Sequence, residues 1–166
     1  MMIHRIAIPL LAGVAAMAAA GAATKPTPPA PNPAWQEECG GCHLAYPPGL
    51  LPARSWRRIT TGLERHFGSD ASLDAATLQL IDRWLQAHGG SGKRGTEEPP
   101  EDRITRAAWF VREHRKIDAA AWKLASVRSA AHCAACHGAA DRGRFDEGSL
   151  RLPEGLDARQ RRAWND

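Results

Sequence analysis

The sequence predicts an all-α protein built from short helices and long loops. Apolar residues recur at helical spacing in several segments, and no segment alternates apolar and polar residues in the way of a half-buried strand. Stretches rich in glycine and proline separate the helical segments, and the chain holds 15 glycines and 12 prolines among its 166 residues. A chain of this length is enough for one domain or two small ones.

In the first half of the chain, helices are expected on both sides of an irregular loop. A short helix is expected over residues 34–39, and three prolines forbid a helix in the loop 46–52. Residues 54–67 should form an amphipathic helix, because apolar residues recur there at i, i+3, i+7 and i+11. The next helix should begin at a Ser72 cap and run to residue 88, where two glycines end it.

The second half begins after residues 89–103, which are a linker by composition because glycine, proline and charge replace any apolar pattern. Helices are then expected near residues 105–117 and over about 119–132. The rest is rich in glycine and charge. Residues 153–166 should be a polar tail that is frayed from residue 159 onward.

All four cysteines of the chain lie in two Cys-x-x-Cys-His motifs, at residues 39–43 and 133–137. This pattern is typical of the attachment site of c-type haem. On a helical turn residues i and i+3 share a face, so both thiols can bond to the two vinyl groups along one haem edge. The next residue can then bind the iron. We therefore expect two covalent haem c groups held by Cys39, Cys42, Cys133 and Cys136, with His43 and His137 as proximal iron ligands.

Other interpretations of the cysteine pairs are weaker. A single four-cysteine zinc site would have to join pairs that are far apart in the chain, and it leaves the histidine after each pair unexplained. A thioredoxin-like dithiol belongs beside a βαβ pattern, which neither pair has. Two structural disulfides are compatible with an exported protein, but they too give no role to the histidines.

Residues 1–22 are typical of a cleavable signal peptide. Arg5 is followed by an apolar stretch, and Ala20-Gly21-Ala22 fits a small-residue cleavage site. The alternative is a membrane anchor, but the stretch is short and rich in alanine compared with the roughly 20 strongly apolar residues of a span. We therefore expect a periplasmic protein that does not span the membrane. Loss of Arg5 lowers the formal net charge from +4 to +3, and the haem propionates bring it near zero, which disfavours nucleic-acid binding.

The supply of iron ligands predicts bis-histidine coordination. All three methionines fall within residues 1–22, so the processed chain cannot use the His/Met ligation that raises the potential of many small cytochromes. His66 and His114 lie on apolar helical faces, and we expect them to be the distal iron ligands of two low-potential haems. His88 is the last residue of its helix, where the helix dipole alone favours a histidine. His132 directly precedes a haem-bonded cysteine and is poorly placed to reach that iron.

Three stretches, CGGCHLAYPPGLLPARSW, LERHFGSDASLD and WFVREH, followed by the second cysteine motif, resemble the bacterial dihaem cytochrome c family known as DHC. The resemblance covers residues 35 to about 152. It implies a small cytochrome c fold with an N-terminal half like a class I cytochrome c, and two low-spin haems whose distal ligands correspond to His66 and His114. It also implies a membrane b-type cytochrome as electron donor and a small, oxygen-binding monohaem cytochrome c as acceptor.

The sequence as a whole predicts an electron carrier and not an enzyme, since two six-coordinate irons leave no position for peroxide or oxygen. The main alternative is a dihaem enzyme or gas-binding sensor with one five-coordinate iron. A third is a haem module tethered to a larger complex by its proline-rich segment. The expected organisation is a signal peptide (1–22), a Pro-rich tether (23–34), an N-terminal haem region (35–88), a linker (89–103), a C-terminal haem region (104–152) and a polar tail (153–166).

Overall fold

The structure is a computed structural model that describes residues 30–162 and 164. The expected signal peptide lies outside these residues. The described part is helical and has no β-strands, as the sequence predicts. Its α-helices are α1 (Pro33–Gly40), α2 (Ala53–Thr60), α3 (Ala75–His88), α4 (Gly92–Thr96), α5 (Ala108–Glu113) and α6 (Ala158–Arg162), and most other elements are single 3₁₀ turns.

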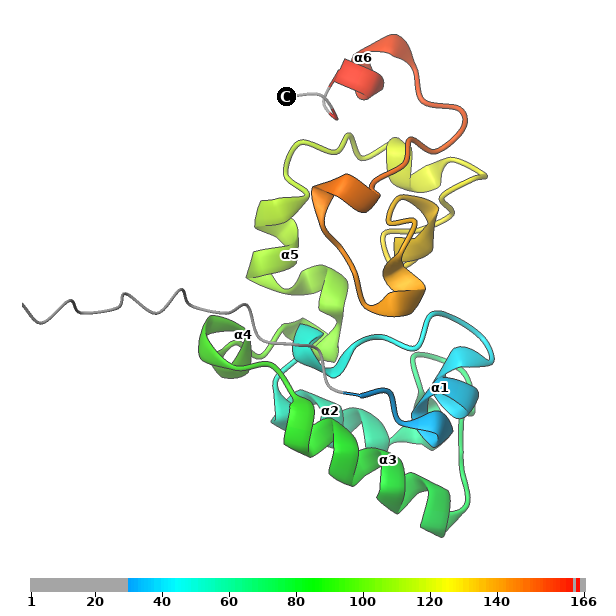
Figure 1. Ribbon diagram of the computed structural model, residues 1–166, viewed down its shortest axis with the longest axis vertical. Coiled ribbons are helices and arrows are strands. Elements are labelled where there is room, and N and C mark those ends of the chain that lie inside the picture. The colour runs from blue at the N-terminus through cyan, green and yellow to red at the C-terminus, as the bar shows by residue number, and fades with distance from the viewer. Residues whose placement is uncertain (1–29, 163, 165–166) are drawn as a thin grey trace, which may run out of the picture.

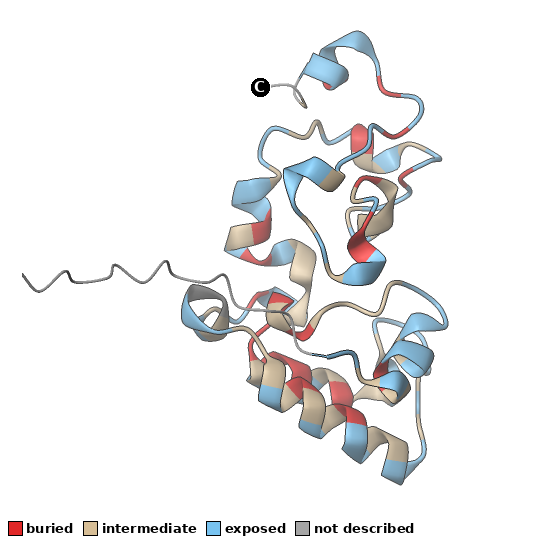
Figure 2. Ribbon diagram, in the orientation of Figure 1, coloured by how far each residue is buried: buried red, intermediate tan, exposed pale blue. Residues whose placement is uncertain are grey.

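The N-terminal region is a small helical cluster in which α2 packs along α3 and α1 packs against α3. Figure 1 shows these three helices together at one end of the molecule, with α5 and α6 toward the other end. The buried faces of α2 and α3 point at each other (Figure 2). The core of this region consists of Trp35, Leu51, Trp56, Ile81 and Leu85.

The two longest helices predicted for this region differ from those in the structure at their ends. Helix α2 stops at Thr60, well before the expected end at residue 67, because β-branched Thr60 and Thr61 and then Gly62 favour termination. The Thr61 hydroxyl donates a hydrogen bond to the Arg57 carbonyl oxygen at 2.8 Å and so competes with the helical ladder. Helix α3 is capped by Asp74 and not by the expected Ser72, since the Asp74 carboxylate accepts hydrogen bonds from the backbone N–H groups of the first turn.

Gly89 allows the end of α3 to cross the start of α2. A Cβ atom on this glycine would lie 2.7 Å from the backbone nitrogen of Ala53, a distance that no side chain tolerates. The neighbouring Gly90 N–H donates a 2.7 Å hydrogen bond to the Leu51 carbonyl oxygen. The two glycines therefore end the helix and also fix the close contact between α3 and α2.

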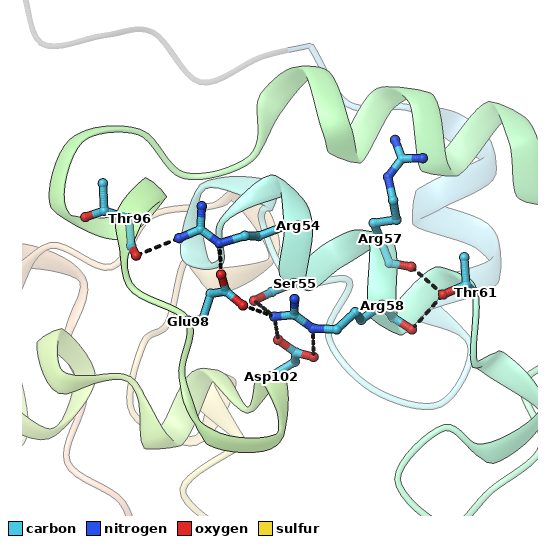
Figure 3. Close-up of polar contacts among 8 residues, drawn as sticks. All are labelled: Arg54, Ser55, Arg57, Arg58, Thr61, Thr96, Glu98 and Asp102. Carbon is cyan, nitrogen blue, oxygen red and sulfur yellow. Dashed lines mark hydrogen bonds and ion pairs between the residues drawn. The ribbon is translucent and has the colours of Figure 1, made fainter.

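Residues 89–103, which have the composition of a linker, fold onto α2. It contains α4 and a 3₁₀ turn (Pro100–Asp102), and its acidic residues form an ion-pair network with the arginines of α2 (Figure 3). The Arg58 guanidinium donates two hydrogen bonds to Asp102, at 2.7 and 2.8 Å, and lies 2.7 Å from a Glu98 oxygen. Arg54 also pairs with Glu98. The segment is thus held against the N-terminal region.

The C-terminal region is less helical than the sequence predicts. Helix α5 is shorter than the expected 105–117 and ends with His114 at its C-cap. The expected helix over 119–132 is wrong: this stretch has only one 3₁₀ turn, Ala121–Lys123, and Arg128 adopts a positive φ of 69°. Ala121 and Val127 are nevertheless buried. Tertiary packing of these residues overrides the helix propensity of the alanines.

The expected fraying from residue 159 is also wrong for the described part of the tail. Helix α6 forms at residues 158–162, and Leu156 and Gln160 are buried. The Arg159 guanidinium lies 2.6 Å from an Asp118 carboxylate oxygen, and the Ser126 hydroxyl donates a 2.7 Å hydrogen bond to the Glu154 carbonyl oxygen. These contacts hold the polar tail on the C-terminal region. Within the described residues, no helix combines the length and apolar character needed to cross a membrane.

The network at Arg58 should stabilise the N-terminal region by more than a surface ion pair does. Asp102 is half-buried and receives two hydrogen bonds from one guanidinium. We expect Arg58→Ala to lower the free energy of unfolding by about 1–2 kcal/mol, measured by reversible denaturation of the holoprotein. Arg142→Ala is the matched control, because Arg142 and Asp141 form an exposed pair of neighbours at 3.4 Å, and it should change the value by less than about 0.5 kcal/mol.

The difference in the free energy of unfolding between wild type and Arg58→Ala should depend on pH. Burial alone would raise the pKa of Asp102, but hydrogen bonds from Arg58 and Ser55 outweigh burial and lower the pKa from its ordinary value of 3.8. A carboxylate with a lowered pKa contributes its full stabilisation above its unfolded-state pKa and loses it as the pH falls. The gap between wild type and Arg58→Ala should therefore be constant near neutrality and shrink below about pH 3.8. A gap that is unchanged in acid contradicts this role of Asp102.

Candidate functional site

The first Cys-x-x-Cys-His motif begins in the last turn of α1. Asn32 caps this helix by accepting a hydrogen bond from the Trp35 N–H at 3.1 Å, and Pro33 occupies its first turn. Cys39 is half-buried against the core, whereas Cys42 is exposed beyond the helix end. His43 follows at once. The capped helix thus fixes the position of one cysteine, and the chain beyond it presents the second cysteine and the histidine.

His43 faces His66 across a gap of defined width. The ring centroids of the two imidazoles lie 6.0 Å apart with an angle of 25° between their planes. A metal ion bound by two opposite imidazoles lies about 2 Å from each ligating nitrogen, and each nitrogen lies about 1 Å from the centroid of its own ring. Such a pair therefore requires about 6 Å between the two centroids. His66 ends a 3₁₀ turn (Leu63–Arg65), and the turn after it contains Phe67 and Gly68 at positive φ angles of 49° and 100°. The early end of α2 therefore gives the chain the freedom to bring His66 opposite His43.

A largely apolar cavity of about 550 Å³ lies between these histidines and the N-terminal core. Its size falls within the range of about 300–1,000 Å³ that is typical of cofactor pockets. The cysteines of the first motif line it, and so do Ala131 and Cys133 from the C-terminal region. Its apolar wall includes Trp35, Leu51, Trp56, Ile59, Leu63, Ile81 and Leu85.

The second motif occupies a 3₁₀ turn (Cys133–Ala135) followed by Cys136 and His137. Cys136 is buried, and its carbonyl oxygen accepts a 2.8 Å hydrogen bond from the Arg151 N–H. The Arg151 guanidinium donates a further hydrogen bond to the Ala134 carbonyl oxygen at 2.6 Å. Arg151 therefore fastens the loop that carries the motif to the chain that follows it.

His137 faces His114, the second predicted distal ligand. Their ring centroids are 6.2 Å apart, and their planes make an angle of 79°. Aromatic rings surround the pair: Phe110 stacks on His114 at 4.0 Å, Trp122 lies 5.8 Å from His114, and Phe145 lies 5.3 Å from His137. The structure thus brings the four predicted histidines together as two pairs with nearly equal separations.

Hydrogen bonds leave one nitrogen of two of these rings available. His43 Nδ1 lies 2.7 Å from the Leu44 carbonyl oxygen, and His114 Nδ1 lies 2.9 Å from the Phe110 carbonyl oxygen. A carbonyl oxygen can only accept, so Nδ1 must carry the proton in both rings, and the Nε2 lone pair is free to bind a metal. The sequence favours a carbonyl in the loop 46–52 as the partner of the proximal His43; the actual partner, Leu44, lies two residues before that loop.

The remaining two rings are kept neutral by their surroundings. Burial and the facing His43 ring lower the pKa of His66. Burial and the facing His114 ring also lower the pKa of His137, against the opposing pull of Asp146. A neutral imidazole is the form that binds a metal. Each proximal imidazole is expected to donate its second N–H to a backbone carbonyl; His137 does not, because its Nδ1 is buried without a hydrogen-bond partner among the described residues.

The thiols are not arranged for other chemistry. Burial, with a smaller effect of Glu38, raises the pKa of Cys39 to about 11, and burial raises the pKa of Cys133 to about 11. Such thiols are protonated at neutral pH, unlike those of a reactive dithiol or a zinc site. Within the described residues, no three His, Cys, Asp or Glu side chains are grouped to hold a metal ion by themselves. The residues therefore fit two haem groups.

The two weaker histidine candidates lie outside both pairs. His88 Nδ1 donates a 2.8 Å hydrogen bond to the Trp84 carbonyl oxygen within α3. His132 Nδ1 donates one of 3.0 Å to the Val127 carbonyl oxygen. Sequence reasoning missed the aromatic neighbours of the histidine pairs, Tyr46, Trp122 and Phe145, because they lie in segments without a regular apolar pattern.

Comparisons with known proteins agree with this arrangement. Residues 35–145 match the family DHC, dihaem cytochrome c. A solved dihaem cytochrome type c from Shewanella baltica OS155 is similar to this chain, with 38% identity and a TM-score of 0.65 over 74% of this chain and 94% of that one. DHC purified from Rhodobacter sphaeroides has 39% identity and a TM-score of 0.60 over 69% and 96% of the two chains. Another structure, of a dihaem cytochrome c from Rhodobacter sphaeroides, has 40% identity and a TM-score of 0.62 over the same shares.

No curated protein matches the chain by sequence. The family match covers both cysteine motifs and both histidine pairs, and the solved relatives are matched over nearly their whole length. The chain therefore belongs to the dihaem cytochrome c family and is an electron-transfer haem protein that carries two covalently attached haem c groups.

Proposed function

We propose that this protein is a periplasmic one-electron carrier whose two haems are both six-coordinate, bis-histidine, low-potential centres. Cys39 and Cys42 hold the N-terminal haem with His43 and His66 as iron ligands, and Cys133 and Cys136 hold the C-terminal haem with His137 and His114. The single observation that carries the proposal is the spacing of the rings, 6.0 and 6.2 Å between centroids in the two pairs.

Each haem supplies an iron that cycles between the ferric and ferrous states, and the residues of this chain set the potential of that cycle. Two neutral imidazoles donate more electron density than an imidazole and a thioether, so the ferric state is favoured. The Leu44 and Phe110 carbonyl oxygens accept hydrogen bonds from His43 and His114, which makes these ligands still more basic. The apolar lining of the cavity excludes water from the iron.

The cavity also has one polar side, at which a haem propionate can be held. Among the described residues that line it, Arg103 is the only arginine or lysine; Ser69, Ser72 and Thr105 supply hydroxyl groups, and Glu38, Asp70 and Asp102 supply carboxylates. The Arg103 guanidinium lies 4.5 Å from the centre of the Phe67 ring, next to His66. Arg103 Nε also lies 3.0 Å from a Glu101 carboxylate oxygen, which offsets its charge, so Arg103 is suited mainly to cover the distal side of the N-terminal site.

The proposed location and partners rest on the sequence and on the family. Residues 1–22 have the pattern of a signal peptide, and covalent haem attachment in bacteria takes place outside the inner membrane. We propose a membrane b-type cytochrome as donor and a small, oxygen-binding monohaem cytochrome c as acceptor. The alternative, a dihaem enzyme or gas sensor, requires one iron with an open position, and two closed histidine pairs disfavour it.

The ligand assignment predicts the effect of removing one distal histidine. His66→Ala and His114→Ala should each convert one of the two haems to a high-spin, ligand-accessible form, because the iron loses its sixth ligand. The measurement is the ferric absorption and magnetic circular dichroism spectrum, with carbon monoxide binding to the reduced protein. We expect half of the haem to bind carbon monoxide in each variant and none in the wild type.

His88→Ala is the matched control for both variants. His88 is half-buried and its ring contacts the ring of Trp84, but its Nδ1 donates a hydrogen bond within its own helix. The substitution should leave both haems low-spin and cost at most about 0.3–1 kcal/mol of stability from the lost helix-dipole interaction. A high-spin signal in His88→Ala, together with an unchanged spectrum in His114→Ala, contradicts the assignment.

The haem should also be required for folding. A chain with all four motif cysteines changed to alanine would lack the group that fills the cavity of about 550 Å³. The apolar side chains that line this cavity would then be exposed to water and would lose the burial that stabilises the region. We therefore expect thermal unfolding of this variant, followed by circular dichroism, to be broad and non-cooperative. A sharp transition like that of the holoprotein would show that the protein core suffices.

A further inference from the structure

Tyr46 contacts parts of both haem sites. It is the only tyrosine of the chain. Its ring stacks on the His43 ring, with 4.9 Å between centroids and 25° between planes. Its hydroxyl donates a 2.7 Å hydrogen bond to the carbonyl oxygen of Ala131, which is 85 residues away in the chain. Tyr46 therefore joins a proposed iron ligand of the N-terminal haem to the segment that leads into the second cysteine motif.

The acceptor of this hydrogen bond belongs to the attachment edge of the C-terminal haem. The Ala131 carbonyl oxygen also accepts a 2.9 Å hydrogen bond from the Cys133 N–H and lies 3.5 Å from Cys133 Sγ. Ala131 and Cys133 both line the cavity of the N-terminal haem, as Tyr46 does. The sulfur that bonds to one haem thus lies in the wall around the other.

The arrangement of the chain makes this contact a link between two regions. The loop that follows α1 runs along the side of the N-terminal region that faces the C-terminal region (Figure 1). Pro48, two residues beyond Tyr46, is buried, and its carbonyl oxygen accepts a 2.6 Å hydrogen bond from the Trp56 indole. The loop is therefore anchored to the core, and Tyr46 extends from a fixed base.

We propose that Tyr46 is a positioning residue that couples the two haems: its ring orients His43, its hydroxyl fixes the Cys133 attachment edge, and together they hold the haems at the separation needed for electron exchange between them. The inference rests on the proposed function, because it takes His43 as an iron ligand. The exchange itself moves one electron, so that one iron is oxidised to the ferric state as the other is reduced to the ferrous state.

Tyr46→Phe tests the hydroxyl alone, since it keeps the ring that stacks on His43. In half-reduced holoprotein, the widths of the haem-methyl proton resonances report the rate of electron exchange between the haems. We expect a severalfold slower exchange in Tyr46→Phe, with both haems still covalent and low-spin. An exchange rate equal to that of the wild type overturns the inference.

Ser126→Ala is the matched control. The Ser126 hydroxyl also donates a 2.7 Å hydrogen bond to a distant backbone carbonyl, that of Glu154, but it touches neither histidine pair. This variant should exchange electrons at the wild-type rate. A high-spin haem in the wild-type protein would instead contradict the proposed function, so failure of the ligand assignment and failure of the coupling are distinguishable.

A second measurement uses the natural sequence and does not depend on the maturation of a variant. Because Tyr46 is the only tyrosine, growth with 3-fluorotyrosine places one fluorine label beside both haems. We expect the fluorine resonance to shift twice during a stepwise reduction, once as each iron loses its paramagnetic ferric state. A resonance that responds to the reduction of one haem only overturns the inference.

Discussion

The proposed bis-histidine coordination sets one constraint on the fold: two histidine rings must lie opposite each other with about 6 Å between their centroids, and this must happen twice. Each pair joins residues that are 23 positions apart in the chain, His43 with His66 and His114 with His137. The capped helix α1 fixes the base of the first gap, and the early end of α2 and the sharp turn at Phe67 allow His66 to close it. In the C-terminal region, the end of α5 presents His114 in the same way.

The core side chains surround the space between the paired histidines and do not fill it. Leu51, Ile81 and Leu85 are almost fully buried, yet all three also line the cavity. The covalent haem completes the packing of these side chains. The ion pairs of Arg58 with the folded linker and the contacts of the tail with Asp118 add polar interactions to this apolar packing.

The sequence predicts the chemistry of this molecule better than its helices. The two cysteine motifs, the absence of methionine after residue 22 and the placement of His66 and His114 in apolar surroundings are local signals. They indicate the same four histidines that the structure brings together as two pairs. The helix expected over 119–132 fails because Val127 is buried by tertiary packing that no local pattern reveals. The early end of α2 could be predicted from the sequence, because Thr60-Thr61-Gly62 is a termination signal. The contact of Tyr46 with Ala131 spans 85 residues and could not be predicted.

The two pairs differ in one respect that a single spectrum can detect. The imidazole planes are 25° apart at His43 and His66 but 79° apart at His114 and His137. The angle between axial imidazoles controls the splitting of the iron d orbitals, so nearly parallel and nearly perpendicular pairs give different low-spin ferric signals. The most direct measurement is the low-temperature electron paramagnetic resonance spectrum of the oxidised holoprotein. The proposed coordination predicts two low-spin signals of equal weight, one rhombic and one with a single large principal g value. A high-spin signal from either haem would contradict it.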